Sequence, residues 1–364
     1  MDTGSYTFDA LYKKYDAFSA PSFSVTVGGT KIERAAFIPY LEVELKADGT
    51  AGGCTFVIQS RYDYDKQDWV NDAESSIEVG AKLSVSVGYV EQKEVFYGFV
   101  DDYSMEFPDD DAPLMRVNGL DALGFLMCFQ EPIYGGKSKP KEVVEKILNK
   151  AQSAGYAKSI TIGSLDGFET PVIKKGVDDW KFLNTLAARY GVTLAVVDGE
   201  IVFKNLASST SPVVTLTMGK DLLSFSRKVS LAHQVGKVEI WGRDKNQGFL
   251  KGEANKCSIS GDGKTAVELA PKFKDAAIRE YSEFAKTQEE CDKMAQGRLD
   301  SIAMNLVSGH GLCIGIPEMI PGRYVKIAKA EERLNGSYFL TKVKHIFDER
   351  AGFLTAFEIK GARA

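Results

Sequence analysis

The sequence predicts a mainly β protein with an α/β insertion, in which two β-barrel-like domains flank a small α/β domain. Strand-type alternation fills both ends of the chain, helix-type spacing dominates the middle, and a similar turn-and-strand pattern occurs in both β-rich ends. A chain of 364 residues is also long enough for several cores. The expected parts are an N-terminal extension, a first β-barrel domain, an α/β insertion, and a second β-barrel domain with a helix near 287–304; they cover residues 1–19, 20–118, 119–206 and 207–364.

The first β-rich part begins after an aromatic segment. Residues 6–18 place apolar side chains three or four apart, which predicts an amphipathic helix that Pro21 ends. Residues 22–27 then alternate and lead into Gly28-Gly29, a hairpin signal. Alternation in 41–45 and 82–89 indicates antiparallel strands with one wet face. The run Asp109 to Asp111 between two prolines predicts a polar connection.

The middle of the chain carries two helix signals. One helix is expected to begin at Pro140 and to end at Gly155. A second has Asp178 as a plausible N-cap and Gly191 as its C-terminal stop. The following residues, 192–203, predict a hairpin around an Asp-Gly turn.

The last part returns to β structure. Residues 237–241 alternate, and a Thr-x-x-Glu capping box at Thr287 and Glu290 opens a third helix. Three strands, within 325–327, 339–347 and 353–359, are expected to form a closing antiparallel meander. Residues 79–85 followed by 97–100 resemble 320–327 followed by 336–343, which suggests that the two β domains are related copies.

Composition narrows the functional class. The net charge is −5 with 44% hydrophobic and 26% charged residues, as in a folded soluble protein without a basic stripe for nucleic acid or a membrane surface. The N-terminus has no secretory pattern, so synthesis in the cytoplasm is expected, and the longest uncharged stretch, 301–317, is too polar to span a membrane. The widely spaced cysteines, which predict buried free thiols, are Cys54, Cys128, Cys257, Cys291 and Cys313.

Catalytic patterns are mostly missing. The three histidines, His233, His310 and His345, have no metal-ligand spacing, and His345 is predicted to be a partly buried strand residue. Gly261 to Thr265 superficially resembles a phosphate-binding loop, but Ser258 stands where that motif needs glycine, so a hairpin turn is preferred. Cys54 has no local histidine partner. The sequence therefore predicts no catalytic, cofactor-binding or metal-binding residues.

Charged and aromatic residues allow functions other than a structural one. The carboxylate runs, Asp101-Asp102, Asp109 to Asp111 and Glu289-Glu290, favour solvated loops and helix ends over an acid–base pair, although a hydrolase cleft stays open. Of the three tryptophans, Trp180 is predicted to be core and Trp69 an interface anchor, while Trp241 carries no specific prediction. A β-rich carbohydrate-binding or adhesin module is the alternative function.

Three sequence blocks are informative when they are read in order. The first is the strand and turn of 20–29. The second is the Asp-Asp-Trp-Lys-Phe-Leu helix of 177–192. The third is the closing meander, with Pro321-Gly322, Gly336 to Tyr338, Val343, His345 and Phe357-Glu358. Together these blocks resemble the phage late control gene D family, which is similar to the hub portion of VgrG spikes. The resemblance spans about 20–360 and leaves the aromatic N-terminal segment outside as a possible docking arm.

The resemblance implies a non-enzymatic baseplate hub of a contractile phage tail or related injection particle. Such a hub is a homotrimer whose two β-barrel-like domains per chain form a pseudo-sixfold ring, joining a sixfold tail tube to a threefold spike. The implied partners are a separate spike protein, a tail tube or tube-initiator protein, a tape measure protein and other baseplate subunits. Assembly in the bacterial cytoplasm and residence in a virion or an extracellular tail-like particle follow from the same resemblance.

Overall fold

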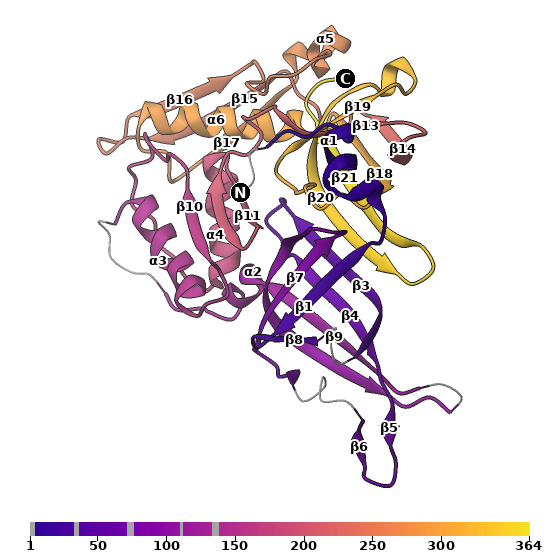
Figure 1. Ribbon diagram of the computed structural model, residues 1–364. Coiled ribbons are helices and arrows are strands. Elements are labelled where there is room, and N and C mark those ends of the chain that lie inside the picture. The colour runs from indigo at the N-terminus through magenta and orange to yellow at the C-terminus, as the bar shows by residue number, and fades with distance from the viewer. Residues whose placement is uncertain (1–3, 33–35, 71–75, 110–111, 133–137) are drawn as a thin grey trace.

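The computed structural model describes residues 4–32, 36–70, 76–109, 112–132 and 138–364 (Figure 1). Strands account for 42% of the residues and helices for 21%, which confirms the predicted mainly β class. A 13-stranded sheet dominates, accompanied by two three-stranded sheets and one two-stranded ribbon. Residues 1–3 of the predicted extension and Asp110-Asp111 of the predicted polar connection lie outside the described residues.

The large sheet is built from two groups of strands. The first group consists of β1 (Ser22–Val27), β2 (Thr30–Lys31), β3 (Phe37–Lys46), β4 (Gly53–Gln59), β7 (Lys82–Gly88), β8 (Gln92–Glu106) and β9 (Leu114–Asp121). The second group consists of β13 (Pro212–Thr217), β14 (Leu222–Val229), β18 (Val307–Ile314), β19 (Tyr324–Ala328), β20 (Gly336–Asp348) and β21 (Gly352–Gly361), with the short η5 (Glu332–Leu334) before β20. Alternating buried and exposed side chains in both groups place their apolar faces in one continuous core.

The two groups repeat one pairing order. In the first, β1 pairs with β7, and the sheet continues through β8, β9 and β4 to β3; in the second, β13 pairs with β19, and the sheet continues through β20, β21 and β18 to β14. One pair differs, because β1 and β7 are antiparallel whereas β13 and β19 are parallel. The repeated pairing order supports the duplication that the sequence suggested.

Local details repeat as well. The Gly80 amide donates to the Val100 carbonyl, and the Gly322 amide donates to the Leu340 carbonyl, both at 2.8 Å. Each register then shifts directly after that acceptor, between Val100 and Asp102 in β8 and between Leu340 and Lys342 in β20. Residues of β8 therefore correspond to residues 240 positions later in β20.

The two predicted β-barrel-like domains do not form closed barrels in the part of the chain that the structure describes. Among the described strands neither group closes on itself, because β3 at the end of the first group pairs antiparallel with β20 of the second. The sequence of a strand indicates that it is a strand but not which strand it pairs with. An edge that closes a barrel and an edge that joins a neighbouring repeat therefore look alike in sequence. The result is an open, twisted sheet that runs through both repeats.

The α/β module lies beside this sheet. It contains α2 (Ala122–Leu126), α3 (Pro140–Ser153), β10 (Ser159–Ile162), α4 (Asp179–Tyr190), β11 (Thr193–Val197) and β12 (Glu200–Lys204). The predicted caps are confirmed: the Asp178 carboxylate accepts from the Lys181 amide at 2.7 Å, and Gly191 ends α4 with a left-handed φ of 64°. Positive φ at both Asp198 and Gly199 fits the predicted turn.

A second insertion separates β14 from β18. It contains β15 (Lys237–Arg243), β16 (Phe249–Ala254), α5 (Ala266–Leu269), η4 (Pro271–Asp275), β17 (Ala277–Tyr281) and α6 (Gln288–Ala303). The sequence placed these residues in the second β domain, but their apolar side chains share a core with the α/β module instead. Thr287 caps α6 as predicted, whereas the buried Glu290 carboxylate accepts from the amides of Glu169 and Thr170. The capping signal is local in sequence, whereas the contact of Glu290 with 169–170 joins residues far apart in the same chain.

The aromatic N-terminal segment folds onto its own chain. It forms α1 (Phe8–Lys14) and η1 (Asp16–Phe18), a shorter helix than the predicted 6–18. Leu11 and Tyr15 are buried, and the Tyr15 hydroxyl donates to the Glu318 carboxylate at 2.6 Å. Burial and this carboxylate raise the pKa of Tyr15 far above its usual value. The described part of the predicted docking arm is therefore packed within the chain.

A short junction connects the α/β module to the large sheet. The carbonyl of Gly49, in the β3–β4 turn, accepts from Trp180 Nε1 at 2.6 Å and from Asn184 Nδ2 at 2.9 Å. Trp180 is half-buried and packs against the core of the α/β module at its boundary, so the predicted core position is correct only in part. Both donors lie on α4, in the sequence block that carried the strongest resemblance.

Gly49→Ala is expected to be more destabilising than Gly29→Ala. Both glycines have a φ near +90°, at +84° and +93°, so both substitutions strain the backbone by about 1–2 kcal/mol. Only at Gly49 would the new Cβ meet a neighbour, the Asn184 side chain. We expect Gly49→Ala to lose roughly a further 1 kcal/mol in chemical unfolding. Equal losses for the two variants would show that the junction contributes nothing.

Candidate interaction surfaces

The three histidines lie in different surroundings. His310 is exposed on β18, His233 lies in a turn, and His345 is fully buried, deeper than the partial burial expected. In the described ranges no group of three or more His, Cys, Asp or Glu side chains is arranged to hold a metal ion. No helix in those ranges is both long and apolar enough to cross a membrane.

The cysteines and the apparent phosphate loop also have structural surroundings. Cys54, Cys291 and Cys313 are buried as predicted, but Cys257 is half-buried and Cys128 is exposed. Residues 261–265 form no hairpin; they are a loop from β16 to α5 in which Thr265 caps the helix with Glu268. The amide of Lys264 donates to the Ala364 carbonyl at 2.8 Å, so the C-terminus occupies one side of this loop.

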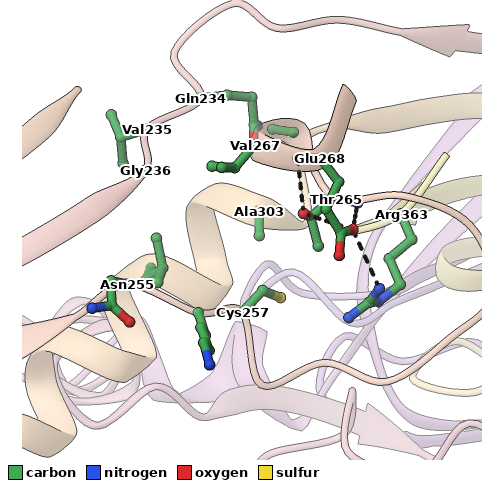
Figure 2. Close-up of a pocket in the computed structure, with 13 residues that line it drawn as sticks. Gln234, Val235, Gly236, Asn255, Cys257, Thr265, Val267, Glu268, Ala303 and Arg363 are labelled. Carbon is green, nitrogen blue, oxygen red and sulfur yellow. Dashed lines mark hydrogen bonds and ion pairs between the residues drawn. The ribbon is translucent and has the colours of Figure 1, made fainter. Parts of the chain in front are cut away.

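A cavity of about 350 Å³ opens beside this loop (Figure 2). Several of its polar side chains have partners within the chain: Gln234 donates to the Ile302 carbonyl at 2.8 Å, and Arg363 lies 3.7 Å from the Glu268 carboxylate, as Figure 2 shows for the second pair. Burial raises the pKa of Cys257 to about 11, so its thiol is protonated at neutral pH and a poor nucleophile. The described lining comes from α5, α6 and the segments beside them.

One face of the large sheet is lined with charges where the two repeats join. Lys344 lies 2.7 Å from Glu42 and 3.2 Å from Glu44, and Lys342 lies 3.1 Å from Glu358. The cations belong to β20, whereas Glu42 and Glu44 belong to β3. These pairs are half-exposed, so each adds little stability. Together they place cations of β20 beside anions of β3 across the junction.

The C-terminal half of β8 is a free sheet edge. Residues 102–106 pair with β9 on one side, and β7 ends before it reaches them on the other. All six residues from Asp101 to Glu106 are exposed. Tyr103, Met105 and the next residue, Phe107, retain 42%, 45% and 47% of their accessible surface and alternate along one face. An apolar, unpaired edge of this length favours pairing with another strand.

The strand β14 is a second free edge and the last strand at one end of the sheet order. Among the described strands it pairs with β18 alone, apart from a bridge of Leu222 to Met218, and Val229 keeps 43% of its surface. This edge carries Arg227 and Lys228, while the β8 edge carries Asp101, Asp102 and Glu106. The two free edges therefore have opposite charge.

A projecting hairpin carries an aromatic cluster. It consists of β5 (Tyr62–Asp63) and β6 (Asp68–Trp69) and extends from the bottom of the sheet in Figure 1. Tyr62 makes edge-to-face contacts with Tyr64, Trp69 and Phe107 at centroid distances of 5.0 to 5.5 Å. Because the rings pack edge-on against each other, they form a tip and not a flat stacking platform.

Together these features define a β protein with a duplicated open sheet, two complementary free edges and no reactive centre among the residues described. Comparison with known proteins gives the same fold. The tail protein from Neisseria meningitidis MC58 has a TM-score of 0.67 at 15% identity, with 94% of this chain and 97% of that chain covered. The 43 kDa tail protein of prophage MuSo2 from Shewanella oneidensis has the same TM-score and identity, with coverages of 93% and 98%.

A more distant structure has the same fold. The E. coli c3393 protein, a type VI secretion system component with structural similarity to phage T4 tail proteins gp27 and gp5, has a TM-score of 0.57 at 11% identity, with coverages of 92% and 76%. By sequence, the chain belongs to the family described as the Alg8 N-terminal domain, whose model matches residues 18–349. No curated protein matches the sequence. The matched model is not that of the late control gene D family.

Proposed function

We propose that this protein is a structural, non-enzymatic hub of a contractile phage tail or related injection particle, and that it acts as a homotrimer. The observation that carries the proposal is the duplicated sheet, in a fold shared with phage tail proteins. Three chains with two similar repeats each present six similar units, the arrangement needed to join a sixfold tube to a threefold spike. The resemblance to the late control gene D and VgrG-like hubs supports the same role.

The partners follow from this role. The tube side would contact a tail tube or tube-initiator protein and the tape measure protein, and the opposite side a separate spike protein and other baseplate subunits. The particle would be assembled in the bacterial cytoplasm and would keep the hub in its baseplate. The carbohydrate-binding or adhesin alternative is less well supported, because the aromatic rings of the hairpin pack mainly against each other.

The test is the copy number in solution and in particles. Native mass spectrometry of the purified chain should give three times the mass of one chain, and class averages of particles should place three copies at the junction of tube and spike. A ring-shaped trimer is expected because heterologous contacts between unlike edges close only by rotation. A chain that stays monomeric at every concentration, or copies repeated along the tube, would refute the proposal.

A further inference from the structure

The junction inside the chain shows how two repeats join. Strand β3 of the first repeat pairs antiparallel with β20 of the second, with Glu44 opposite Lys344 and Leu41 opposite Phe347. In the duplicated order, β14 occupies the place of β3, and β8 occupies the place of β20. The two strands that form the internal junction therefore correspond to the two strands whose edges are free.

Burial shows the effect of that junction on equivalent residues. From Thr341 to Ile346, which β3 covers, every residue of β20 is buried or half-buried. The equivalent residues of β8, Asp101 to Glu106, are all exposed. The β8 edge thus has the sequence pattern of a covered strand, but no strand among the residues that the structure describes covers it.

We propose that the free edge of β8 in one copy pairs antiparallel with the free edge of β14 in the next copy, in the register of the internal β3–β20 junction. The inference rests on the proposed trimer and specifies its contact. Residues of β3 correspond to residues 184 positions later in β14, because Val43 faces Cys54 as Arg227 faces Gly309. Transfer of the register places Ser104 opposite Lys228, Tyr103 opposite Val229 and Phe107 opposite Phe225.

Side-chain chemistry agrees with that register. Two of the three exposed apolar side chains meet apolar partners, since Tyr103 faces Val229 and Phe107, the residue after β8, faces Phe225. Met105, between them, faces Arg227. On the polar face Lys228 lies diagonally between Asp102 and Glu106, within reach of both carboxylates. A register shifted by one residue would move Tyr103 and Phe107 opposite polar-face residues.

Charge also selects against wrong pairings. At the internal junction β20 carries the cations Lys342 and Lys344, and β3 carries the anions Glu42 and Glu44. The free edges carry the reverse, with anions on β8 and cations on β14. Pairing β8 with a neighbour's β3, or β14 with a neighbour's β20, would therefore place like charges together. The charges therefore favour pairing of β8 with β14 over pairing of either edge with β3 or β20.

Disulfide cross-linking tests the register. Cys128→Ser first removes the exposed native thiol. Ser104→Cys with Lys228→Cys places two exposed cysteines directly opposite each other, about 4.5–5.5 Å apart between Cα atoms, which suits a disulfide. Ser104→Cys with Ser226→Cys is the matched control, because a slip of two residues keeps the face but leaves the pair too far apart, at about 7–8 Å. We expect mild oxidation to give covalent trimers from the first pair only.

The outcomes separate the inference from the proposed function. If both pairs fail to cross-link in a sample that native mass spectrometry shows to be trimeric, the strand contact is wrong and the trimer stands. Cross-linking of the control pair alone would overturn the register. If the Cys128→Ser chain is monomeric at every concentration, the trimer and the contact fail together.

Charge reversal gives a second, independent measurement. Lys228→Glu should weaken the trimer by about tenfold or more in its dissociation constant, because it faces two carboxylates across the junction. Adding Asp102→Lys and Glu106→Lys should restore assembly of the Lys228→Glu chain. All three positions are exposed in the single chain, so folding should be unaffected. A triple variant as weak as the single one would overturn the contact.

Discussion

Replacing Asp179 with alanine is expected to lower the free energy of unfolding by about 3–5 kcal/mol. Asp179 at the start of α4 forms an ion pair with Lys174, and both side chains are fully buried. Its other oxygen lies 2.8 Å from Lys150 Nζ. Without Asp179 the Lys174 ammonium would keep, among the described residues, the Phe129 carbonyl at 3.3 Å, so a buried charge would be left without its counter-ion.

The neighbouring residue supplies the control. Asp178→Ala removes the N-cap of the same helix and an ion pair with the exposed Lys181 at 3.3 Å, and should lose about 1 kcal/mol. The double variant Lys174→Met with Asp179→Leu should recover most of the stability, because it removes both buried charges and keeps the volume. Chemical unfolding followed by circular dichroism measures all three. If Asp179→Ala lost no more than Asp178→Ala, the ion pair would not be the cause.

Acid is expected to destabilise the protein through His345. Its Nε2 lies 3.2 Å from the Met319 carbonyl, which accepts only, so Nε2 carries the proton. Its Nδ1 then accepts from the Thr355 hydroxyl at 3.1 Å, and that hydroxyl accepts from the Ile316 amide at 3.0 Å. Burial lowers the pKa of His345 to about 3. The native ring is therefore neutral at both neutral and mildly acidic pH.

The pKa of His345 in the folded and in the unfolded chain sets the direction of the pH effect on stability. The unfolded chain takes up the proton near pH 6.5 and the folded chain near pH 3, so stability is full above about 6.5 and falls as the pH drops toward 3. The loss should reach roughly 2–3 kcal/mol at pH 4.5. His345→Gln, although less stable at pH 7.5, should show a shallower fall in unfolding midpoint between pH 6.5 and 4.5.

Two comparisons isolate this histidine. His310→Gln, an exposed change on β18, is the matched control for replacing a histidine by glutamine. Buried Asp121 has the opposite effect, because burial raises its pKa to about 7 and its contribution is lost as the pH rises from about 4 to 7. Since both proteins contain Asp121, its contribution cancels in the difference. Equal slopes for the natural chain and His345→Gln would contradict the assignment.

Local sequence signals predicted the elements well. The caps Asp178, Gly191 and Thr287, the Asp198-Gly199 turn and the alternation of the strands all act within a few residues, and the structure has each of them. The signals that failed in whole or in part depend on distant partners. Glu290 reads as a helix-end carboxylate but is buried against 169–170, and Trp180 reads as core but donates to Gly49 in another module.

The same division applies to the candidate surfaces. Nothing in the sequence distinguished β8, whose edge is free, from β20, whose edge is covered, because both alternate in the same way. The related turn-and-strand patterns at 79–100 and 320–343 did indicate the duplication, and topology and register then aligned the two repeats residue by residue.

By itself the sequence determined the mainly β class, the positions of helices and turns, and the two related halves, since these depend on local conformational preference and periodicity. Only the tertiary structure decided that the halves share one open sheet, that the insertion after β14 joins the α/β core, and which edges stay uncovered. Strand partners and buried pairs are chosen by packing between residues far apart in the chain, and no local pattern records that choice.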